Sequence, residues 1–180
     1  VNMTDYGLLA KQIVSLAEVD AHWLPVLSNA AALLWDALDD INWAGFYLVD
    51  PVTVPSVELG AAPSAHEPCA PELRTPELRL GPFQGKVACV RIPFGKGVCG
   101  TAAETKTSQL VEDVHQFPGH IACDSASNSE VVVPIVKDNQ VVGVLDIDSP
   151  SVARFTQEDL TGLEQVVKAL ESCVNFSHFC

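Results

Sequence analysis

Apolar residues recur at helical spacing in two segments near the start of the chain, residues 5–16 and 21–38. In the second segment the apolar positions are Leu24, Val26, Leu27, Ala31, Leu34 and Leu38. This spacing predicts two amphipathic helices, because residues three and four apart share one side of an α-helix. A third apolar stripe, over residues 160–173, follows Thr156 with Asp159 three positions on, which is the pattern of a helix start.

Between these helices lie short segments rich in β-branched and aromatic residues, which predict strands. The predicted strands are residues 43–49, 78–84, 88–92, 131–136 and 140–148. The last two are joined by Lys-Asp-Asn at 137–139, a hairpin signal. A turn at 95–97 precedes a short predicted helix at 98–104, and residues 114–128 resemble a polar loop. Together these elements predict an α+β fold, an antiparallel sheet with helices packed on it.

The segment between the first two strands has a different composition. Six of the twelve prolines fall between Pro51 and Pro76, with almost no hydrophobic periodicity. We expect a surface insertion at about 51–77 rather than a second domain. A chain of 180 residues fits a single domain spanning 1–180.

The net charge of the chain excludes some classes of binding partner. Ten basic residues face 23 acidic ones, which gives a formal net charge of −13. Such a surface repels phosphate backbones and anionic lipids, so we expect neither a nucleic acid nor a membrane partner. There is no apolar stretch of about eighteen residues that would span a bilayer. The first five residues lack a secretory pattern, and we expect a cytoplasmic protein.

Six cysteines then need an explanation, because the cytoplasm keeps most thiols reduced. Cys173 continues an apolar helix stripe, and Cys69 and Cys180 lie in a predicted loop and tail, where packing or exposure explains them. Cys89 and Cys123 are different, since each lies in or near polar sequence at a strand end or loop.

Cys99 shares this setting and opens a predicted helix just behind Lys96. A helix N-terminus and a nearby cation favour the thiolate, so we expect the pKa of Cys99 to be lowered. His120 lies three residues from Cys123 and could help to deprotonate it. The surroundings alone leave redox work and simple packing of these cysteines both open.

A zinc site is the competing interpretation. Its ligands would be His115, His120 and Cys123, with Cys89 or Cys99 as the fourth. The cysteines are widely separated and form no C-x-x-C pair, so this interpretation is less favoured.

Three carboxylates and one aromatic residue are further candidates. Asp146 and Asp148 alternate along a predicted strand, so their side chains share one face, and Glu130 precedes an apolar strand. Two like charges on one face favour a cation between them, such as a substrate ammonium group, or else a strand end reaching solvent. Trp43 could belong to the core or form the wall of a pocket for a small thioether-like group.

Five segments, in order, resemble one known family. They are INWAGFYL from residue 41, LGPFQGKVAC from 80, GKGVCGTA from 95, GHIACD from 119 and GVLDID from 143. Together they closely resemble the free methionine-(R)-sulfoxide reductases, stand-alone GAF-domain enzymes, over about residues 20–175. The chain departs from that family in its Pro-rich insertion, where a short hairpin connection is expected.

The resemblance implies a GAF-like fold, with a central antiparallel sheet of about six strands flanked by helices, often dimeric. It implies that Cys89, Cys99 and Cys123 are the redox cysteines. It also implies that Glu130, Asp146 and Asp148 help to bind the substrate, with Trp43 at the methyl sulfoxide. No bound cofactor is expected.

Thiol chemistry supplies a mechanism for such an enzyme. A cysteine thiolate attacks the sulfoxide sulfur, an acid such as Glu130 protonates the departing oxygen, and a second cysteine forms a disulfide with the first. We expect Cys123 to attack and Cys89 to resolve, with Cys99 assisting, although the helix-start argument favours Cys99 as nucleophile. An external dithiol such as the thioredoxin/NADPH system would then restore the enzyme.

The alternative from another class is a non-catalytic GAF sensor that binds a small molecule such as a cyclic nucleotide, since one fold hosts many functions. A sensor has no need of three cysteines at these positions.

Overall fold

The fold is known from a computed structural model, which describes residues 4–49, 76–119 and 126–179. Its elements in chain order are α1 (Tyr6–Val19), α2 (Trp23–Ala37), β1 (Trp43–Val49), β2 (Glu77–Gly85), β3 (Arg91–Pro93), α3 (Gly97–Thr105), β4 (Gln109–Val111), a 3₁₀ turn (Val114–Gln116), β5 (Ser129–Lys137), β6 (Gln140–Ser149) and α4 (Gln157–Cys173). The strands form one six-stranded sheet in the order β3-β2-β1-β6-β5-β4, and neighbouring strands are antiparallel.

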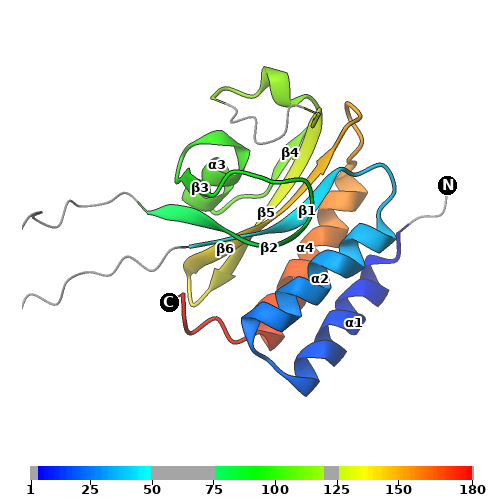
Figure 1. The fold of residues 1–180 in the computed structure, drawn as a ribbon, viewed down its shortest axis with the longest axis vertical. Helices are drawn as coiled ribbons and strands as arrows, with labels where there is room; N and C mark the ends of the chain where they lie inside the picture. Colours follow the sequence, from blue (N-terminus) through cyan, green and yellow to red (C-terminus); the bar gives the residue numbers. More distant parts are fainter. Residues whose placement is uncertain (1–3, 50–75, 120–125, 180) are drawn as a thin grey trace, which may run out of the picture.

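The helices divide unequally between the two faces of this sheet (Figure 1). On one face α1 packs on α4, α4 lies against β5, and α2 lies against β1 and β2. This face holds the larger core, with Ile13, Leu27, Leu145, Ile147 and Leu163 fully or almost fully buried. On the other face only α3 contacts β5, β6 and β3 among the described helices. A smaller apolar cluster lies there, and it includes Trp43 and Cys99.

Local sequence explains the best-defined boundaries. Thr156 caps α4: its hydroxyl accepts from the Asp159 backbone N–H at 3.2 Å, while the Asp159 carboxylate accepts from the Thr156 N–H at 2.8 Å. Asp138 and Asn139, both with positive φ, form the two-residue turn between β5 and β6. These residue types tolerate that conformation, so the turn fixes the register of the hairpin.

The predicted α+β class and most predicted elements are confirmed. The hairpin of β5 and β6, the strand at 43–49 and the capped last helix lie where the sequence placed them, within two residues. The strand predicted at 88–92 is wrong in part, since pairing with β2 begins only at Arg91. The three-residue β4 was not predicted. Strand β2 begins at Glu77, and residues 50–75 of the predicted insertion lie outside the described residues.

Within the described parts of the chain, none of the helices combines the length and apolar character needed to cross a bilayer.

Candidate functional site

The candidate site lies on the face of the sheet that α3 covers, where strands from three parts of the chain bring polar residues into register. Asp148 on β6 lies opposite Trp43 on β1 and opposite Glu130 on β5. Asp146, two residues earlier on the same face, lies opposite Gly45 and Val132. The predicted shared face of the two aspartates is therefore confirmed, and Glu130 belongs to the same face.

Cys99, Glu130 and Asp146 form a buried acidic cluster. The Cys99 Sγ donates to Glu130 Oε1 at 3.9 Å, and one ligand atom from each of the three residues lies within 4.8 Å of the others. Cys99 is 3% exposed, and Glu130 and Asp146 are each 6% exposed. Asp146 Oδ1 is buried and has no hydrogen-bond partner among the described residues. A buried acceptor without a donor is costly, so this cluster needs a functional explanation.

Burial changes the protonation of the two carboxyls in different degrees. Desolvation raises the pKa of Asp146 from 3.8 to about 6, against the lowering effect of hydrogen bonds from Cys99 and Glu130. Desolvation and the nearby charges of Asp146 and Asp148 raise the pKa of Glu130 well above its usual value. Burial therefore favours the protonated form of both carboxyls, while a pKa of about 6 leaves Asp146 ionised at neutral pH. The cluster thus combines a proton donor with a buried negative charge.

The expectation of a lowered pKa for Cys99 is wrong. Cys99 does lie in the first turn of α3, behind Lys96, as the sequence indicated. However, desolvation and the carboxylates Asp146 and Glu130 raise the pKa of its thiol well above the usual value. Burial beside two acidic groups outweighs the helix end, so Cys99 stays a neutral thiol.

Aromatic side chains form one wall of the site. The Trp43 ring stacks on Tyr47 at 5.7 Å and on Phe83 at 5.3 Å between centroids, and its Nε1 donates to the Lys86 carbonyl at 3.2 Å. Trp43 is thus buried, but in the smaller cluster beside Cys99 rather than in the helical core. Trp43 therefore belongs to a core cluster, and its place at a substrate pocket stays a prediction.

Tyr47 and Gly45 belong to this wall and were missed by the sequence reasoning. A Cβ at Gly45 would lie 2.3 Å from the Phe83 Cβ and 2.8 Å from Trp43, so only glycine allows the rings to pack there. Both residues occur in the segment from 41 to 48 that carried the family resemblance. The period of two from Trp43 could have placed them on its face.

Cys89 lies in the loop between β2 and β3, where it packs against the cluster that contains Cys99. It is disulfide-bonded, whereas Cys99 and Cys173 are free thiols, so its partner is not among the described cysteines. Cys123 and His120 lie outside the described residues. Cys173 is half-buried on α4, as expected for a packing residue.

Some of the proposed zinc ligands can also be located. The His115 Nε2 lies 2.9 Å from Asn128 Oδ1 on the surface. Among the described residues, the one group spaced like metal ligands is the acidic cluster itself, which contains no histidine. Structural zinc sites are built mainly from cysteine and histidine, and this cluster offers one thiol and two carboxyls. The composition of the cluster therefore fits proton sharing better than zinc.

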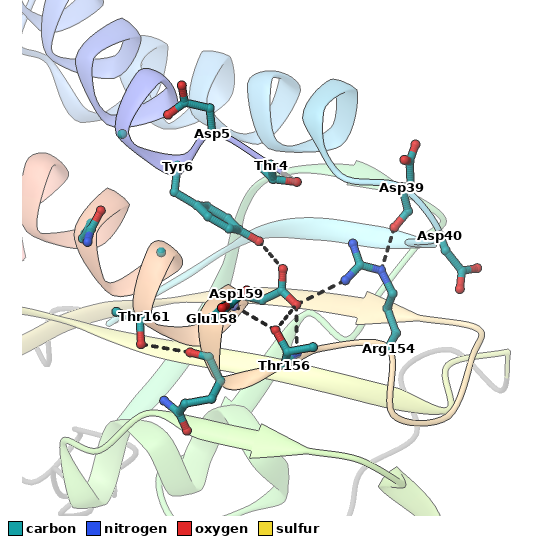
Figure 2. Close-up of a pocket in the computed structure, with 14 residues that line it drawn as sticks. Thr4, Asp5, Tyr6, Asp39, Asp40, Arg154, Thr156, Glu158, Asp159 and Thr161 are labelled. Atoms are coloured by element: carbon teal, nitrogen blue, oxygen red, sulfur yellow. Dashed lines mark hydrogen bonds and ion pairs between the residues drawn. The ribbon is translucent and has the colours of Figure 1, made fainter. Parts of the chain in front are cut away.

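An open pocket of about 980 Å³ lies elsewhere, between the start of α1, the loop before β1 and the start of α4 (Figure 2). Its lining includes Asp5, Asp39, Asp40 and Glu158, and it contains no cysteine. Its described lining therefore offers no thiol chemistry.

Comparison with known proteins places these features in a family. Residues 27–174 match the GAF domain model. The free methionine-R-sulfoxide reductase of Escherichia coli is 48% identical over 172 residues, which cover 95% of this chain and 90% of that protein. The structure of fRMsr of Staphylococcus aureus in the reduced form has a TM-score of 0.79 and 49% identity, covering 97% of both chains. The free methionine-R-sulfoxide reductase from Neisseria meningitidis, in complex with its substrate, has a TM-score of 0.78 and 39% identity, covering 96% of this chain and 90% of that one.

Proposed function

The chain belongs to the free methionine-R-sulfoxide reductases, a family of GAF-domain proteins, and we propose that it reduces free L-methionine (R)-sulfoxide to methionine. The observation that carries the proposal is the buried acidic cluster under α3 with its unsatisfied Asp146 Oδ1. An oxidoreductase of this class needs a thiol, a proton donor and a way to recognise a free amino acid. The described site offers the proton donor and the recognition groups, and the attacking thiol is assigned below to Cys123, which lies outside the described residues.

Recognition of the free amino acid would fall to the aspartates of β6. Asp146, with a pKa of about 6, is ionised at neutral pH and has one buried oxygen without a partner among the described residues, and Asp148 lies two residues along on the same face. An ammonium group offers up to three donors and a compensating positive charge. Methionine inside a polypeptide lacks this group. The aspartates would therefore select the free amino acid.

The reducing chemistry would use a cysteine and Glu130. A thiolate attacks the sulfoxide sulfur, and the protonated Glu130 gives its proton to the oxygen, which leaves as water with a second proton. A water molecule then attacks the cysteine sulfur and supplies its oxygen, methionine departs, and the attacking cysteine becomes a sulfenic acid, oxidised by two electrons. A second cysteine thiol then attacks that sulfur, forms a disulfide and releases water.

We assign the attack to Cys123 and the resolution to Cys89. Two observations support this order over one with Cys99 as nucleophile: Cys89 is already in a disulfide, and Cys99 is a buried free thiol with a raised pKa. Cys99 would then assist by holding Glu130 in place through the 3.9 Å contact. Trp43 and its stacked neighbours would hold the methyl end of the substrate.

Recycling of the disulfide would need an external dithiol, for which the thioredoxin/NADPH system of the cytoplasm is the natural source. No bound cofactor enters this scheme, because all the electrons come from thiols.

The experiment is thioredoxin-coupled NADPH consumption with three substrates side by side: free methionine-(R)-sulfoxide, its S epimer and N-acetylmethionine-(R)-sulfoxide. We expect turnover of the first substrate, little of the other two, and loss of nearly all activity in Cys123→Ser. Cys173→Ser is the matched control and should keep full activity, since Cys173 lies on α4 in the helical layer.

A GAF module that only binds a small molecule would behave differently. It would turn over none of the three substrates with intact thiols, and Cys123→Ser would leave its ligand binding almost unchanged. That result would replace the reductase proposal with the sensor alternative.

A further inference from the structure

The loop between β2 and β3 presents its disulfide-bonded cysteine between two solvated apolar side chains. Val87 is 88% exposed and Val90 is 66% exposed, while Cys89 between them is half-buried. Single exposed valines are common on protein surfaces. These two, however, flank the one described cysteine that is oxidised.

The loop is held at both ends, so this exposure belongs to a fixed surface. The Trp43 indole Nε1 donates to the Lys86 carbonyl at 3.2 Å, and the Leu80 N–H donates to the Val90 carbonyl at 3.0 Å. Hydrogen bonds to β1 and β2 fix the backbone at both ends of the loop, and in this conformation the two valine side chains are exposed to solvent. A partner would meet a preformed surface and lose little entropy in ordering it.

Charge sets the same region apart from the rest of the molecule. The chain carries a net charge of −13, yet residues 77–96 hold four basic residues and one acidic residue. The acidic residue, Glu77, pairs with Arg91 at 3.2 Å. The other three basic residues of this stretch are Arg79, Lys86 and Lys96. A net-basic stretch within an acidic chain favours an acidic partner over a basic one.

We propose that residues 86–91, the docking loop, are the surface on which a protein dithiol binds to reduce the enzyme, and that its thiolate attacks Cys89. The partner would be an acidic protein with an apolar rim around its nucleophilic cysteine, covering Val87 and Val90. This inference rests on the proposed function, in which the disulfide of Cys89 must be reduced after each turnover.

The exchange balances in two steps. The partner's thiolate forms a bond to the Cys89 sulfur, and the bond from Cys89 to its own disulfide partner breaks, releasing that cysteine as a thiolate. The partner's second thiolate then attacks its own sulfur in the mixed disulfide and releases Cys89 as a thiolate. Two electrons pass from the dithiol to the enzyme, and the two released thiolates take up protons.

The test compares a large reductant with a small one on the oxidised protein, without methionine sulfoxide. We would measure the second-order rate constant for disulfide reduction by reduced thioredoxin, and separately by dithiothreitol, in the wild type and in Val87→Ser/Val90→Ser. The matched control is Val19→Ser/Val152→Ser, because Val19 is 88% exposed and Val152 is 58% exposed, both outside the docking loop.

We expect the docking-loop variant to react with thioredoxin about tenfold more slowly, since it loses two apolar contacts, and with dithiothreitol at the wild-type rate. The control should match the wild type with both reductants. Equal thioredoxin rates in all three proteins would overturn the docking loop, as would an equal slowing with dithiothreitol. A protein that is reduced as expected but fails to turn over methionine sulfoxide would instead refute the proposed function.

Discussion

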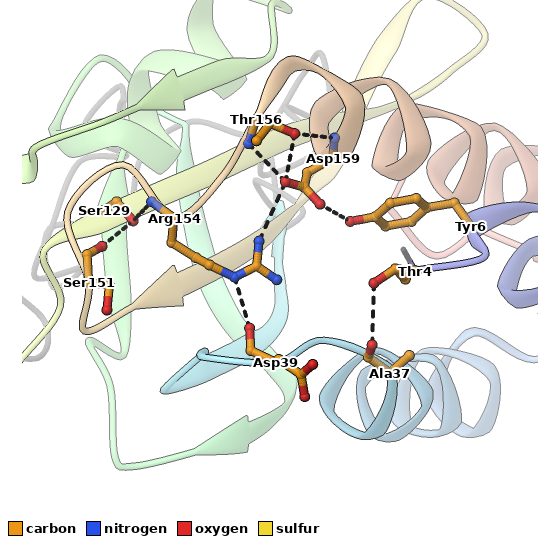
Figure 3. Close-up of polar contacts among 9 residues, drawn as sticks. All are labelled: Thr4, Tyr6, Ala37, Asp39, Ser129, Ser151, Arg154, Thr156 and Asp159. Atoms are coloured by element: carbon orange, nitrogen blue, oxygen red, sulfur yellow. Dashed lines mark hydrogen bonds and ion pairs between the residues drawn. The ribbon is translucent and has the colours of Figure 1, made fainter. Parts of the chain in front are cut away.

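Two aspartates, Asp159 and Asp146, lie on opposite sides of the same sheet, and the protein surrounds their carboxylates in opposite ways. On the helical side, Asp159 accepts from the Tyr6 hydroxyl at 2.6 Å and pairs with Arg154 at 3.4 Å (Figure 3). Under α3, Asp146 has an oxygen with no donor among the described residues, and Glu130, whose pKa burial raises, lies beside it. The carboxylate of Asp159 therefore finds its donors within the protein, whereas one oxygen of Asp146 finds none among the described residues.

The pKa values of Asp159 and Asp146 differ in the same way. Burial alone would raise the pKa of Asp159, but the hydrogen bonds from Tyr6 and Thr156, with the charge of Arg154, hold it below its usual value. Burial raises the pKa of Asp146 to about 6, and its hydrogen bonds do not compensate. A carboxylate with a lowered pKa stabilises the fold, and one with a raised pKa destabilises it when ionised. The carboxylate on the helical face thus stabilises the fold, and the one under α3 does not.

Arg154 shows how far the stabilising cluster reaches. Its Nε donates to the Asp39 carbonyl at 2.8 Å, and its backbone N–H donates to Ser129 Oγ at 3.4 Å. Since Ser129 precedes Glu130, the satisfied cluster also fixes the start of β5, from which the site takes its proton donor.

The largest expected effect concerns the proton donor. Glu130→Gln should lower kcat by about a hundredfold or more, because the amide cannot give a proton to the leaving oxygen. Glu158→Gln makes the same side-chain change at an exposed glutamate on the helical side and should leave kcat unchanged. Steady-state kinetics with free methionine-(R)-sulfoxide measures kcat of both variants and of the wild type. Full kcat in Glu130→Gln would remove the acid role.

The next effect is on stability and has opposite signs in the two clusters. Asp146→Asn should be more stable than the wild type at pH 8 by up to about 3 kcal/mol, because it removes an ionised group whose pKa is raised. The carboxyl of Asp146 in the folded protein holds its proton up to about pH 6. The gain in stability should therefore vanish near pH 4, where the side chain at position 146 is uncharged in both folded proteins. Urea unfolding at the two pH values measures this.

Asp159→Asn should behave in the reverse sense. The lowered pKa of Asp159 stabilises the fold above the usual range of an aspartate, and this contribution is lost as the pH falls through the lowered value. The variant should therefore be less stable than the wild type at pH 8 and approach it in strong acid. The same sign for both variants at pH 8 would break the comparison.

The smallest effect isolates one hydrogen bond. Tyr6→Phe should cost about 1 kcal/mol of unfolding free energy, because it removes the donor to Asp159. It should leave kcat/KM unchanged, since Tyr6 lies on the helical side. A loss of activity in a fully folded Tyr6→Phe protein would show that the two clusters are coupled.

Much of the fold could be predicted because its signals are local. Thr156 and Asp159 mark a helix start within four residues, and Asp138 and Asn139 mark a turn within two. Strand β4 gave no such signal. Its three residues are defined by pairing with β5, where Val111 lies opposite Glu130.

Several of the residues named from the sequence lie together in the structure, but their electrostatics were not predicted. The motifs that carried the family resemblance contain Cys99, Asp146 and Trp43, and the structure places all three on one face. The pKa of Cys99 was predicted in the wrong direction because the local helix start was visible and the distant carboxylates were not. Glu130 and Asp146 reach Cys99 from strands more than thirty residues further along the chain.

The most direct test of the central claim is the preference for a free amino acid in Asp146→Asn. We would measure kcat/KM for free methionine-(R)-sulfoxide and for its N-acetyl derivative in the wild type, in Asp146→Asn and in Asp40→Asn, an exposed aspartate with positive φ that asparagine tolerates. We expect Asp146→Asn to lose at least about tenfold of the preference, through KM for the free substrate, while Asp40→Asn keeps it. An undiminished preference in Asp146→Asn would contradict the claim that the buried acidic cluster recognises the substrate ammonium group.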